Sequence, residues 1–235
     1  WQGVKPHLPR DLRAPVIDLG CGTGRYGLRV AKSGFQTVCS DLSPAMLDTC
    51  LRKAQEMRLE ARVSVRQADV TDLAAFEREH YALAIAQGDV LSFATDPRRA
   101  CKEIRGLLRP GGVLVASVDQ GYAAIAHYVE KGDLEGLEQL LKAGEMEWLA
   151  NDPAERFPVH TFTAESLREL LKSSGLEVLD LFGKTVLPFK KLESHFADEQ
   201  ATRRILGLER KLCRIPSALG LASHLQFAAR RNEQV

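Results

Sequence analysis

Several kinds of segment are missing from this sequence of 235 residues. No apolar run is long enough to span a membrane, and no signal peptide is recognisable. There is no basic block that would suit nucleic acid, and the formal net charge is +1. Repeats and low-complexity linkers are also lacking. We therefore expect a cytoplasmic protein with no membrane and no nucleic-acid partner. Because the chain begins at Trp1 rather than Met, we expect upstream residues to be missing.

Cysteine is present without a recognisable pattern. The five positions are scattered, odd in number and free of Cys-x-x-Cys pairs: Cys21, Cys39, Cys50, Cys101 and Cys213. Such spacing argues against a disulfide framework and against a zinc site. The sequence therefore predicts a protein of a reducing compartment that has no metal site.

The most informative segment is a glycine-rich turn. The apolar residues 14–17 are followed by Asp18-Leu19-Gly20-Cys21-Gly22-Thr23-Gly24. This pattern indicates a buried strand that turns sharply into a helix, which we expect from about Arg25 to Lys32. Glycine lets a ligand lie against the bare backbone, and the start of the helix points free N–H groups at it. The charge of Asp18 suits a cationic or ammonium-bearing ligand better than a phosphate.

Two nucleotide-binding patterns compete for this turn. The dinucleotide fingerprint Gly-x-Gly-x-x-Gly can be placed on Gly22, Gly24 and Gly27, but we expect Gly27 well inside the helix rather than at its start. The pattern Asp-x-Gly-x-Gly-x-Gly fits the end of the strand better. It resembles the first motif of the class I methyltransferases that use S-adenosylmethionine. A nicotinamide-dependent oxidoreductase is therefore the less favoured interpretation.

Later strand ends match the same family. Strands expected at residues 37–40, 63–68 and 81–86 are followed by Asp41, Asp69-Val70 and Gln87-Gly88-Asp89. An acid after the second strand can accept hydrogen bonds from both hydroxyls of a ribose. The resemblance implies that Asp69 lies near the adenine amino group and that Val70 offers a backbone N–H to the ring. It also implies that the backbone of Gln87 and Gly88 borders the methionine part of the cofactor.

The resemblance defines a full set of cofactor-binding residues. Leu42 and Met46 match positions that wall the adenine, at the start of a helix with Ser43 as its N-cap and Pro44 as its first residue. The expected cofactor, S-adenosyl-L-methionine, would be bound by Asp18, Gly20, Cys21, Gly22, Gly24, Asp41, Leu42, Met46, Asp69, Val70, Gln87 and Gly88.

The order of the elements predicts the fold. Strands and helices alternate up to a fifth strand at residues 113–118, which Arg109-Pro110-Gly111-Gly112 introduces, and this arrangement indicates a parallel sheet covered by helices. A sixth strand is expected at residues 176–187, and the resemblance implies that the last strand, at about 221–229, is antiparallel. We therefore expect an α/β, Rossmann-like, doubly wound and mostly parallel sheet of seven strands, in a single domain over residues 1–235.

Two long segments interrupt this alternation. Residues 119–162 show helical spacing and an acidic surplus. We expect a helical insertion that is a solvated helix pair, a lid over the substrate, or both. Residues 188–214 are expected as a helical connection near the substrate pocket. Their basic residues alternate with Leu and Ile at helical spacing, which indicates a solvated helix face.

The resemblance implies methyl transfer. Orientation and exclusion of water can supply much of the acceleration, and a base is needed only when the acceptor must lose a proton. The candidate bases are Asp89, His127, His160, His195 and His224. We favour His160, which is expected at the mouth of the crevice, and Asp89, which is expected near the transferred methyl group, as bases or substrate-positioning residues.

The acceptor is left open by the sequence. The Asn/Asp-Pro-Pro-Tyr type of motif, which resembles methylases of exocyclic or amide nitrogens, does not follow the fourth strand. We therefore predict an S-adenosylmethionine-dependent methyltransferase that acts by in-line displacement on O or N of a small-molecule acceptor, as a monomer or homodimer. The acidic insertion would tolerate an amine. The alternative is a regulatory or partner protein that binds S-adenosylmethionine without catalysis.

Overall fold

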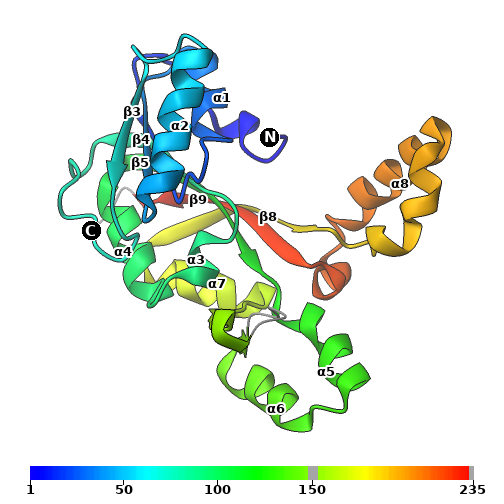
Figure 1. The fold of residues 1–235 in the computed structure, drawn as a ribbon. Coiled ribbons are helices and arrows are strands. Elements are labelled where there is room, and N and C mark those ends of the chain that lie inside the picture. The colour runs from blue at the N-terminus through cyan, green and yellow to red at the C-terminus, as the bar shows by residue number, and fades with distance from the viewer. Residues whose placement is uncertain (148–152, 233–235) are drawn as a thin grey trace. The chain divides into compact units, whose positions relative to one another are not determined.

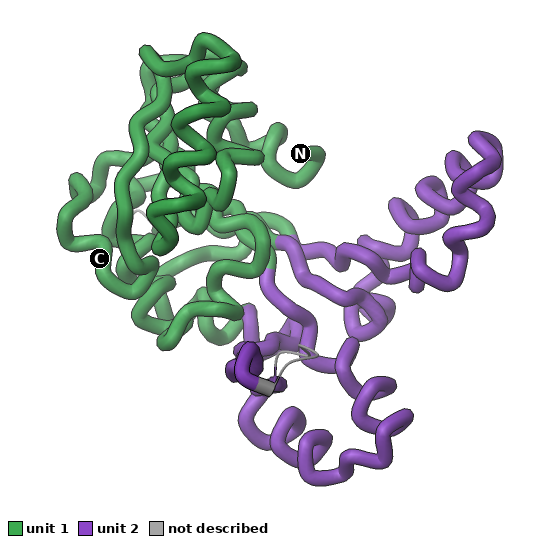
Figure 2. Tube along the Cα trace, viewed as in Figure 1, with its two compact units in different colours: residues 1–117, 168–180, 227–235 green, residues 118–167, 181–226 purple. Residues whose placement is uncertain are grey.

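The structure is a computed structural model that describes residues 1–147 and 153–232. It divides into two compact units (Figure 2): unit 1 comprises residues 1–117, 168–180 and 227–235, and unit 2 comprises residues 118–167 and 181–226. Residues 119–162 and 188–214, which were expected as a helical insertion and a helical connection within a single domain, fall in unit 2. Residues 148–152 of the expected insertion, and residues 233–235, lie outside the described residues.

A seven-stranded sheet organises the fold, in the order β3-β2-β1-β4-β5-β9-β8 (Figure 1). Its strands are β1 (Val16–Leu19), β2 (Thr37–Asp41), β3 (Val63–Gln67), β4 (Tyr81–Ala86), β5 (Leu108–Asp119), β8 (Leu176–Lys184) and β9 (His224–Arg231). The first five pair in parallel. The last strand of the chain, β9, lies between β5 and β8. This mostly parallel sheet with one antiparallel strand confirms the predicted fold class.

Helices connect most of these strands as predicted, but among the described residues no helix lies between β3 and β4, where the alternation was also expected. They are α1 (Gly27–Lys32), α2 (Pro44–Glu56), α3 (Val90–Phe93), α4 (Pro97–Leu107) and α7 (Ala164–Ser173), with the short 3-10 helix η1 (Lys5–His7) near the N-terminus. Ser43 caps α2 by accepting a hydrogen bond from the backbone N–H of Met46 at 3.4 Å, and Pro44 is its first residue, which confirms the expected helix start. Helix α7 is followed by Gly175 at φ 74°.

The expected position of Gly27 is wrong. This residue opens α1 rather than lying inside it, because its N–H donates a hydrogen bond to Asp18 Oδ2 at 2.7 Å. A Cβ on Gly27 would lie 2.4 Å from Cys39 Sγ, so only glycine allows the helix to approach the sheet this closely. The place of Gly27 therefore gives no argument against the dinucleotide fingerprint, in which the third glycine serves the same close packing.

The core of unit 1 surrounds the central strands. All six residues of β4 are buried, which is expected of a strand covered on both faces. One buried cluster joins α1 and α2 to β2 and β3, and another joins α1 to β1, β4 and β5. The backbone at the strand ends is thus held by dense packing on several sides.

Unit 2 consists of two separate segments. The first contains η2 (Gly121–Ala124), α5 (Ile125–Lys131), α6 (Leu134–Ala143), β6 (Glu145–Glu147), η3 (Pro153–Glu155) and β7 (Pro158–His160). The second contains η4 (Phe189–Ala197), α8 (Glu199–Leu212) and η5 (Pro216–Leu221). The helical character predicted for both is present, whereas the antiparallel pair of β6 and β7 was not predicted.

Several predicted boundaries differ from the structure for local reasons. Strand β8 ends three residues early, because the N–H groups of Val186 and Leu187 donate hydrogen bonds to the carboxylate of Glu209. The helical connection expected over residues 188–214 is divided at Asp198, whose side chain caps α8. Strand β5 begins at Leu108, earlier than predicted, and β9 begins later, after η5. Among the described residues, no helix is long and apolar enough to cross a membrane.

Candidate functional site

A cavity of about 340 Å³ lies in unit 1, beside the carboxyl ends of the parallel strands. It is lined by Gly20, Asp41, Leu42, Ala68, Asp69, Val70, Gly88, Val90, Phe93, Ala94 and Thr95. These residues follow β1, β2, β3 and β4, where an open α/β sheet is expected to bind its ligand. The volume is in the range of small-molecule sites.

The glycine turn forms one side of this cavity. Gly20, Gly22 and Gly24 all have positive φ angles, of 60°, 53° and 85°. At Gly20 a Cβ would also lie 2.4 Å from Cγ2 of Val90, which lines the cavity from the segment after β4. At Gly22 a Cβ would meet nothing within 4 Å. Space is therefore critical at Gly20, whereas Gly22 is constrained by its backbone conformation alone.

Asp41 is held rigidly at the end of β2. Its Oδ2 accepts a hydrogen bond from the N–H of Gly22 at 2.8 Å, and its Oδ1 accepts one from the N–H of Ser43 at 2.9 Å. Each carboxylate oxygen retains a second lone pair. The two backbone contacts thus orient a carboxylate that can accept hydrogen bonds from a pair of neighbouring hydroxyl groups.

Asp18 is placed behind the turn. Only 1 % of the residue is exposed, and its Oδ2 accepts the N–H of Gly27 at the start of α1. Burial raises the pKa of Asp18 to about 7, and the hydrogen bond from Gly27 opposes that rise. The carboxyl group therefore fixes the helix to the strand, and its predicted role with a cationic ligand stays a prediction.

Asp69 forms a local turn at the end of β3. Its Oδ1 accepts hydrogen bonds from the N–H and the hydroxyl of Thr71, both at 2.7 Å. This is the side-chain turn that Asp commonly makes. Together with Val70 it lines the cavity, and the role of both residues with the adenine stays a prediction.

The segment after β4 holds an unusual buried amide. Gln87 is 6 % exposed, and neither Oε1 nor Nε2 has a hydrogen-bond partner among the described residues. Leaving a buried polar group unpaired costs about 1–3 kcal/mol. The next two N–H groups, of Gly88 and Asp89, donate to Ser117 Oγ on β5 at 3.2 and 3.3 Å. An orphaned amide at this strand end fits a site that receives a polar ligand.

Half of the predicted cofactor residues line the cavity. These are Gly20, Asp41, Leu42, Asp69, Val70 and Gly88. The other six do not appear in its described wall, and their role with the cofactor stays a prediction: Asp18, Cys21, Gly22, Gly24, Met46 and Gln87. The sequence reasoning missed Ala68, Val90, Phe93, Ala94 and Thr95. Most of these follow Gly88 directly, so extending the strand-end argument by a few residues would have found them.

The two favoured bases lie in different units. Asp89, at φ 63°, is the N-cap residue of α3 in unit 1, between the cavity residues Gly88 and Val90. His160 lies in β7 of unit 2, where its Nδ1 is 3.3 Å from Oε1 of its cross-strand partner Glu145. His224 lies 3.3 Å from Asp119. The role of Asp89 and His160 as bases stays a prediction.

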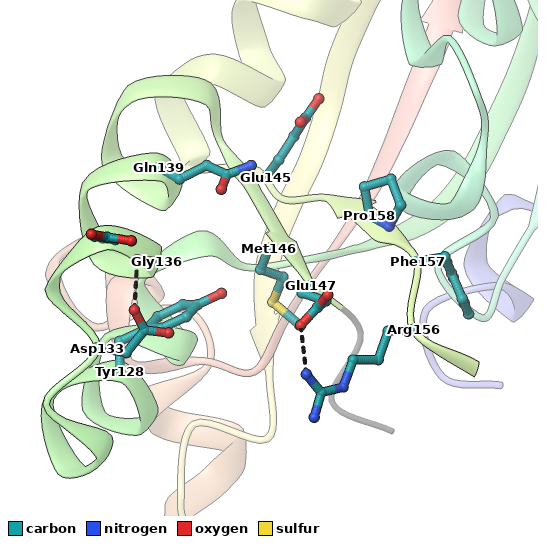
Figure 3. Close-up of a pocket in the computed structure, with 11 residues that line it drawn as sticks. Tyr128, Asp133, Gly136, Gln139, Glu145, Met146, Glu147, Arg156, Phe157 and Pro158 are labelled. Carbon is teal, nitrogen blue, oxygen red and sulfur yellow. Dashed lines mark hydrogen bonds and ion pairs between the residues drawn. The ribbon is translucent and has the colours of Figure 1, made fainter. Parts of the chain in front are cut away.

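A second cavity, of about 400 Å³, lies within unit 2 beside α6 and the β6–β7 pair (Figure 3). The ring of Tyr128 and the side chain of Met146 border it, and an ion pair of 3.3 Å joins Glu147 to Arg156. Further carboxylates in its wall come from Asp133, Glu135 and Glu145. The cavity wall thus includes four acidic side chains of the insertion and none of the predicted cofactor residues.

Comparison with known proteins identifies this architecture. Residues 16–112 match the family described as a methyltransferase domain, and that span contains the whole wall of the first cavity. The chain is 22% identical to tRNA 5-carboxymethoxyuridine methyltransferase of Escherichia coli K12, over 98% of this chain and 86% of that protein. It is 32% identical to carboxy-S-adenosyl-L-methionine synthase of Vibrio cholerae, over 48% of this chain and 45% of that protein.

A solved structure shows the same fold along the whole chain. It is that of an S-adenosylmethionine-dependent methyltransferase from Methanosarcina mazei, with a TM-score of 0.70, 17% identity, and coverage of 100% of this chain and 99% of that one. Residues 16–112 therefore form a methyltransferase domain, and the fold is of the class I, Rossmann-like type. The cofactor of this domain is S-adenosylmethionine, and the predictions of enzyme class and cofactor are confirmed.

Proposed function

We propose that this enzyme transfers a methyl group by in-line displacement to O or N of a small-molecule acceptor. The observation that carries the proposal is the first cavity, whose wall follows the ends of four consecutive parallel strands. S-adenosylmethionine supplies a methyl group that its sulfonium already activates. The protein then has to bind, orient and exclude water, which can lower a barrier by several kcal/mol.

Each strand end contributes a different binding function. The carboxylate of Asp41, fixed by two backbone N–H groups, accepts hydrogen bonds from the ribose hydroxyls. Asp69 and the N–H of Val70 recognise the polar edge of the adenine, and the side chains of Leu42 and Phe93 supply apolar walls. The bare backbone at Gly20 and Gly88 admits the methionine part.

Gln87 completes this assignment. Its amide has a donor and an acceptor without partners among the described residues, so it can hydrogen-bond to either a carboxylate or an ammonium group. The methionine part of the cofactor carries both groups. The cost of burying the amide in the free enzyme would thus be offset when the cofactor binds.

The charge of the insertion supports a small basic or neutral acceptor. Residues 119–165 contain ten acidic and three basic side chains. A field of this sign repels phosphate and attracts amines. The negative charge of residues 119–165 is therefore our reason for proposing a small-molecule acceptor rather than a nucleic acid.

An RNA acceptor is the second candidate. Escherichia coli tRNA 5-carboxymethoxyuridine methyltransferase aligns with 98% of this chain, and its name gives a tRNA substrate. Residues 184–214 contain eight basic and four acidic side chains, a sign that suits phosphate. A tRNA substrate is therefore the specific alternative to a small-molecule acceptor without a nucleic-acid partner.

One experiment separates the candidates. Calorimetry first measures binding of S-adenosylmethionine and S-adenosylhomocysteine, with NADH as the control; we expect micromolar binding of the first two alone. The enzyme is then incubated with labelled methyl donor and either a small-metabolite extract or total tRNA, each with and without ribonuclease. Label in the metabolite pool supports the proposal. Ribonuclease-sensitive label in the tRNA pool would replace it with the second candidate, and binding without transfer would favour the non-catalytic alternative.

A further inference from the structure

Three of the five cysteines, which are scattered in the sequence, lie together in unit 1. Cys21 comes from the glycine turn, Cys39 from β2 and Cys50 from α2. Their three Sγ atoms lie within 4.8 Å of one another, and none forms a disulfide. Cys101 and Cys213 are not part of this group. The spatial cluster therefore corrects the impression of unrelated single thiols.

The surroundings of these sulfur atoms are apolar and tightly packed. Cys39 and Cys50 are 0 % exposed and Cys21 is 7 % exposed, within a cluster whose other members are apolar. A Cβ on Gly24 would lie 2.6 Å from Cys50 Sγ, and one on Gly27 would lie 2.4 Å from Cys39 Sγ. Two glycines thus let the backbone close directly over two of the thiols.

We propose that Cys21, Cys39 and Cys50 form a binding site for one soft metal ion, of which Cu(I) is the best match. Thiolate ligands select soft ions such as Cu(I), and all three donors here are cysteine sulfur. On binding, three sulfur–metal bonds form and the thiol protons pass to solvent, with no change of oxidation state.

The geometry is close to that of a three-sulfur site. In an equilateral triangle with sides of 4.8 Å the centre lies about 2.8 Å from each corner, whereas a zinc–thiolate bond is about 2.3 Å long. Each sulfur therefore has to move inward by about half an ångström at most. A structural zinc ion would require a fourth ligand, and the described cluster offers three. Three available ligands therefore favour Cu(I), which three thiolates can coordinate fully, over zinc.

Occupancy of this site would act on the cofactor turn. Cys21 is flanked by Gly20 and Gly22, and its N–H donates to the carbonyl of Ser40 at 2.9 Å. Gly22 in turn donates to Asp41 at 2.8 Å. Drawing Cys21 toward a bound ion therefore displaces the backbone that orients Asp41, and we expect the ion to weaken cofactor binding.

The test uses the whole reduced protein without oxygen. Cu(I) is titrated in competition with a chromophoric Cu(I) chelator, and Cd(II) is titrated separately while thiolate-to-metal absorption is recorded in the ultraviolet. We expect one ion per chain and an absorption that corresponds to three thiolates. Cys21→Ala and Cys50→Ala should each lower Cu(I) affinity at least 100-fold. Cys101→Ala is the matched control, because Cys101 is also fully buried and lies outside the cluster, and it should leave the affinity unchanged.

A measurement on the unaltered protein guards against variants that fail to fold. X-ray absorption of the Cu(I)-loaded protein should show a shell of three sulfur atoms. A shell with nitrogen or oxygen ligands, or equal loss of affinity in the Cys101→Ala variant, would overturn the proposal. The affinity for S-adenosylmethionine should fall at least tenfold with one equivalent of Cu(I) in the unaltered protein; an unchanged affinity would refute the link to the turn.

Discussion

The two units differ in how much of each element they bury. In unit 1, α1 and α4 each bury four residues, and every residue of β4 is buried. In unit 2, α5, α6 and α8 each bury one. Dense packing fixes the position of each atom in unit 1, whereas the helices of unit 2 are free to vary on most of their surface. The candidate cofactor cavity therefore lies in unit 1, the unit in which packing constrains the geometry more.

Charge shows the same contrast. Unit 1 places a few carboxylates at defined strand ends, where backbone N–H groups orient them, as at Asp41. Unit 2 carries its charge along whole segments: residues 119–165 are strongly acidic and residues 184–214 are basic. Oriented single charges give specificity for one ligand, and broad fields attract a class of ligands. The following changes test this difference.

The largest effect is expected for Gly20→Ala. The new Cβ would lie 2.4 Å from Val90 Cγ2 in a backbone of φ 60°, so the cavity wall must shift and cofactor binding should be lost in calorimetry. Gly22→Ala is the matched control, since it carries a similar φ but has open space, and it should cost about 1–3 kcal/mol of stability. Adding Val90→Ala to Gly20→Ala should restore part of the binding. Equal binding by both single variants would contradict this account.

Asp41→Ala comes next. It removes the acceptor for the ribose hydroxyls and leaves the N–H groups of Gly22 and Ser43 without their carboxylate. Hydrogen bonds to charged groups are worth about 1.5–3 kcal/mol, so the affinity for S-adenosylmethionine should fall about 10- to 150-fold. Glu135→Ala in unit 2 serves as a charge-matched control and should leave that affinity unchanged. A loss of less than threefold for Asp41→Ala would remove Asp41 from the site.

Asp18 predicts a pH dependence of stability. The pKa of Asp18 is about 7 in the folded protein, against the ordinary value of 3.8. Between about pH 4 and pH 7 the folded chain therefore holds a proton on Asp18 that the unfolded chain has lost. The contribution of Asp18 to the free energy of unfolding is complete below about pH 4 and is lost as the pH rises to about 7. The free energy of unfolding falls over this range by up to about 1.4 kcal/mol per pH unit. The pH dependence of the unfolding free energy should therefore differ between the protein and Asp18→Asn from about pH 4 to pH 7, and should be the same outside that range. Parallel curves from pH 4 to 7 would show that Asp18 is ionised throughout.

Gln87→Leu should separate stability from binding. The substitution removes an unpartnered buried amide at nearly constant volume, so the free enzyme should become about 1 kcal/mol more stable. Affinity for S-adenosylmethionine should fall about tenfold at the same time. Thermal unfolding with and without the cofactor measures both effects. A variant that is less stable and binds normally would show that the amide has a structural role.

The smallest effect is expected in unit 2. Asp198→Ala removes the side chain that accepts the N–H groups of Gln200 and Ala201 at the start of α8, which should cost about 1 kcal/mol. Hydrogen exchange should quicken in α8, and the affinity for the cofactor should not change. A change in that affinity would mean that the two units are coupled.

The sequence was informative where one local rule was sufficient. The family resemblance pointed to Asp41, Asp69 and Gly88, and all three line the first cavity because the ends of neighbouring parallel strands meet at one edge of the sheet. The start of α2 at Ser43-Pro44 was found for an equally local reason. The start of α1 was not, because it depends on a hydrogen bond from Gly27 to a carboxylate nine residues earlier.

Tertiary packing explains the remaining differences. Cys21, Cys39 and Cys50 come from a turn, a strand and a helix, and only the packing of these elements brings their sulfur atoms together. The pairing of β6 with β7 joins segments separated by the ten residues 148–157, and no turn signal predicted it. Glu209 ends β8 from a helix more than twenty residues away. These contacts join residues far apart in the sequence, so the periodicity and spacing of residues along the chain cannot predict them.

The position of β9 has a consequence for synthesis on the ribosome. Strand β8 is made earlier, yet β9 is its only neighbour in the described sheet, and β9 is also what joins it to β5. When β9 arrives, its last residue, Arg231, donates hydrogen bonds to the carbonyl of Leu108 and to Glu79. Until then the nascent chain presents unpaired strand edges on both β5 and β8. Vectorial folding can therefore assemble strands β1 to β5 first, and the sheet closes only after β9 has been made.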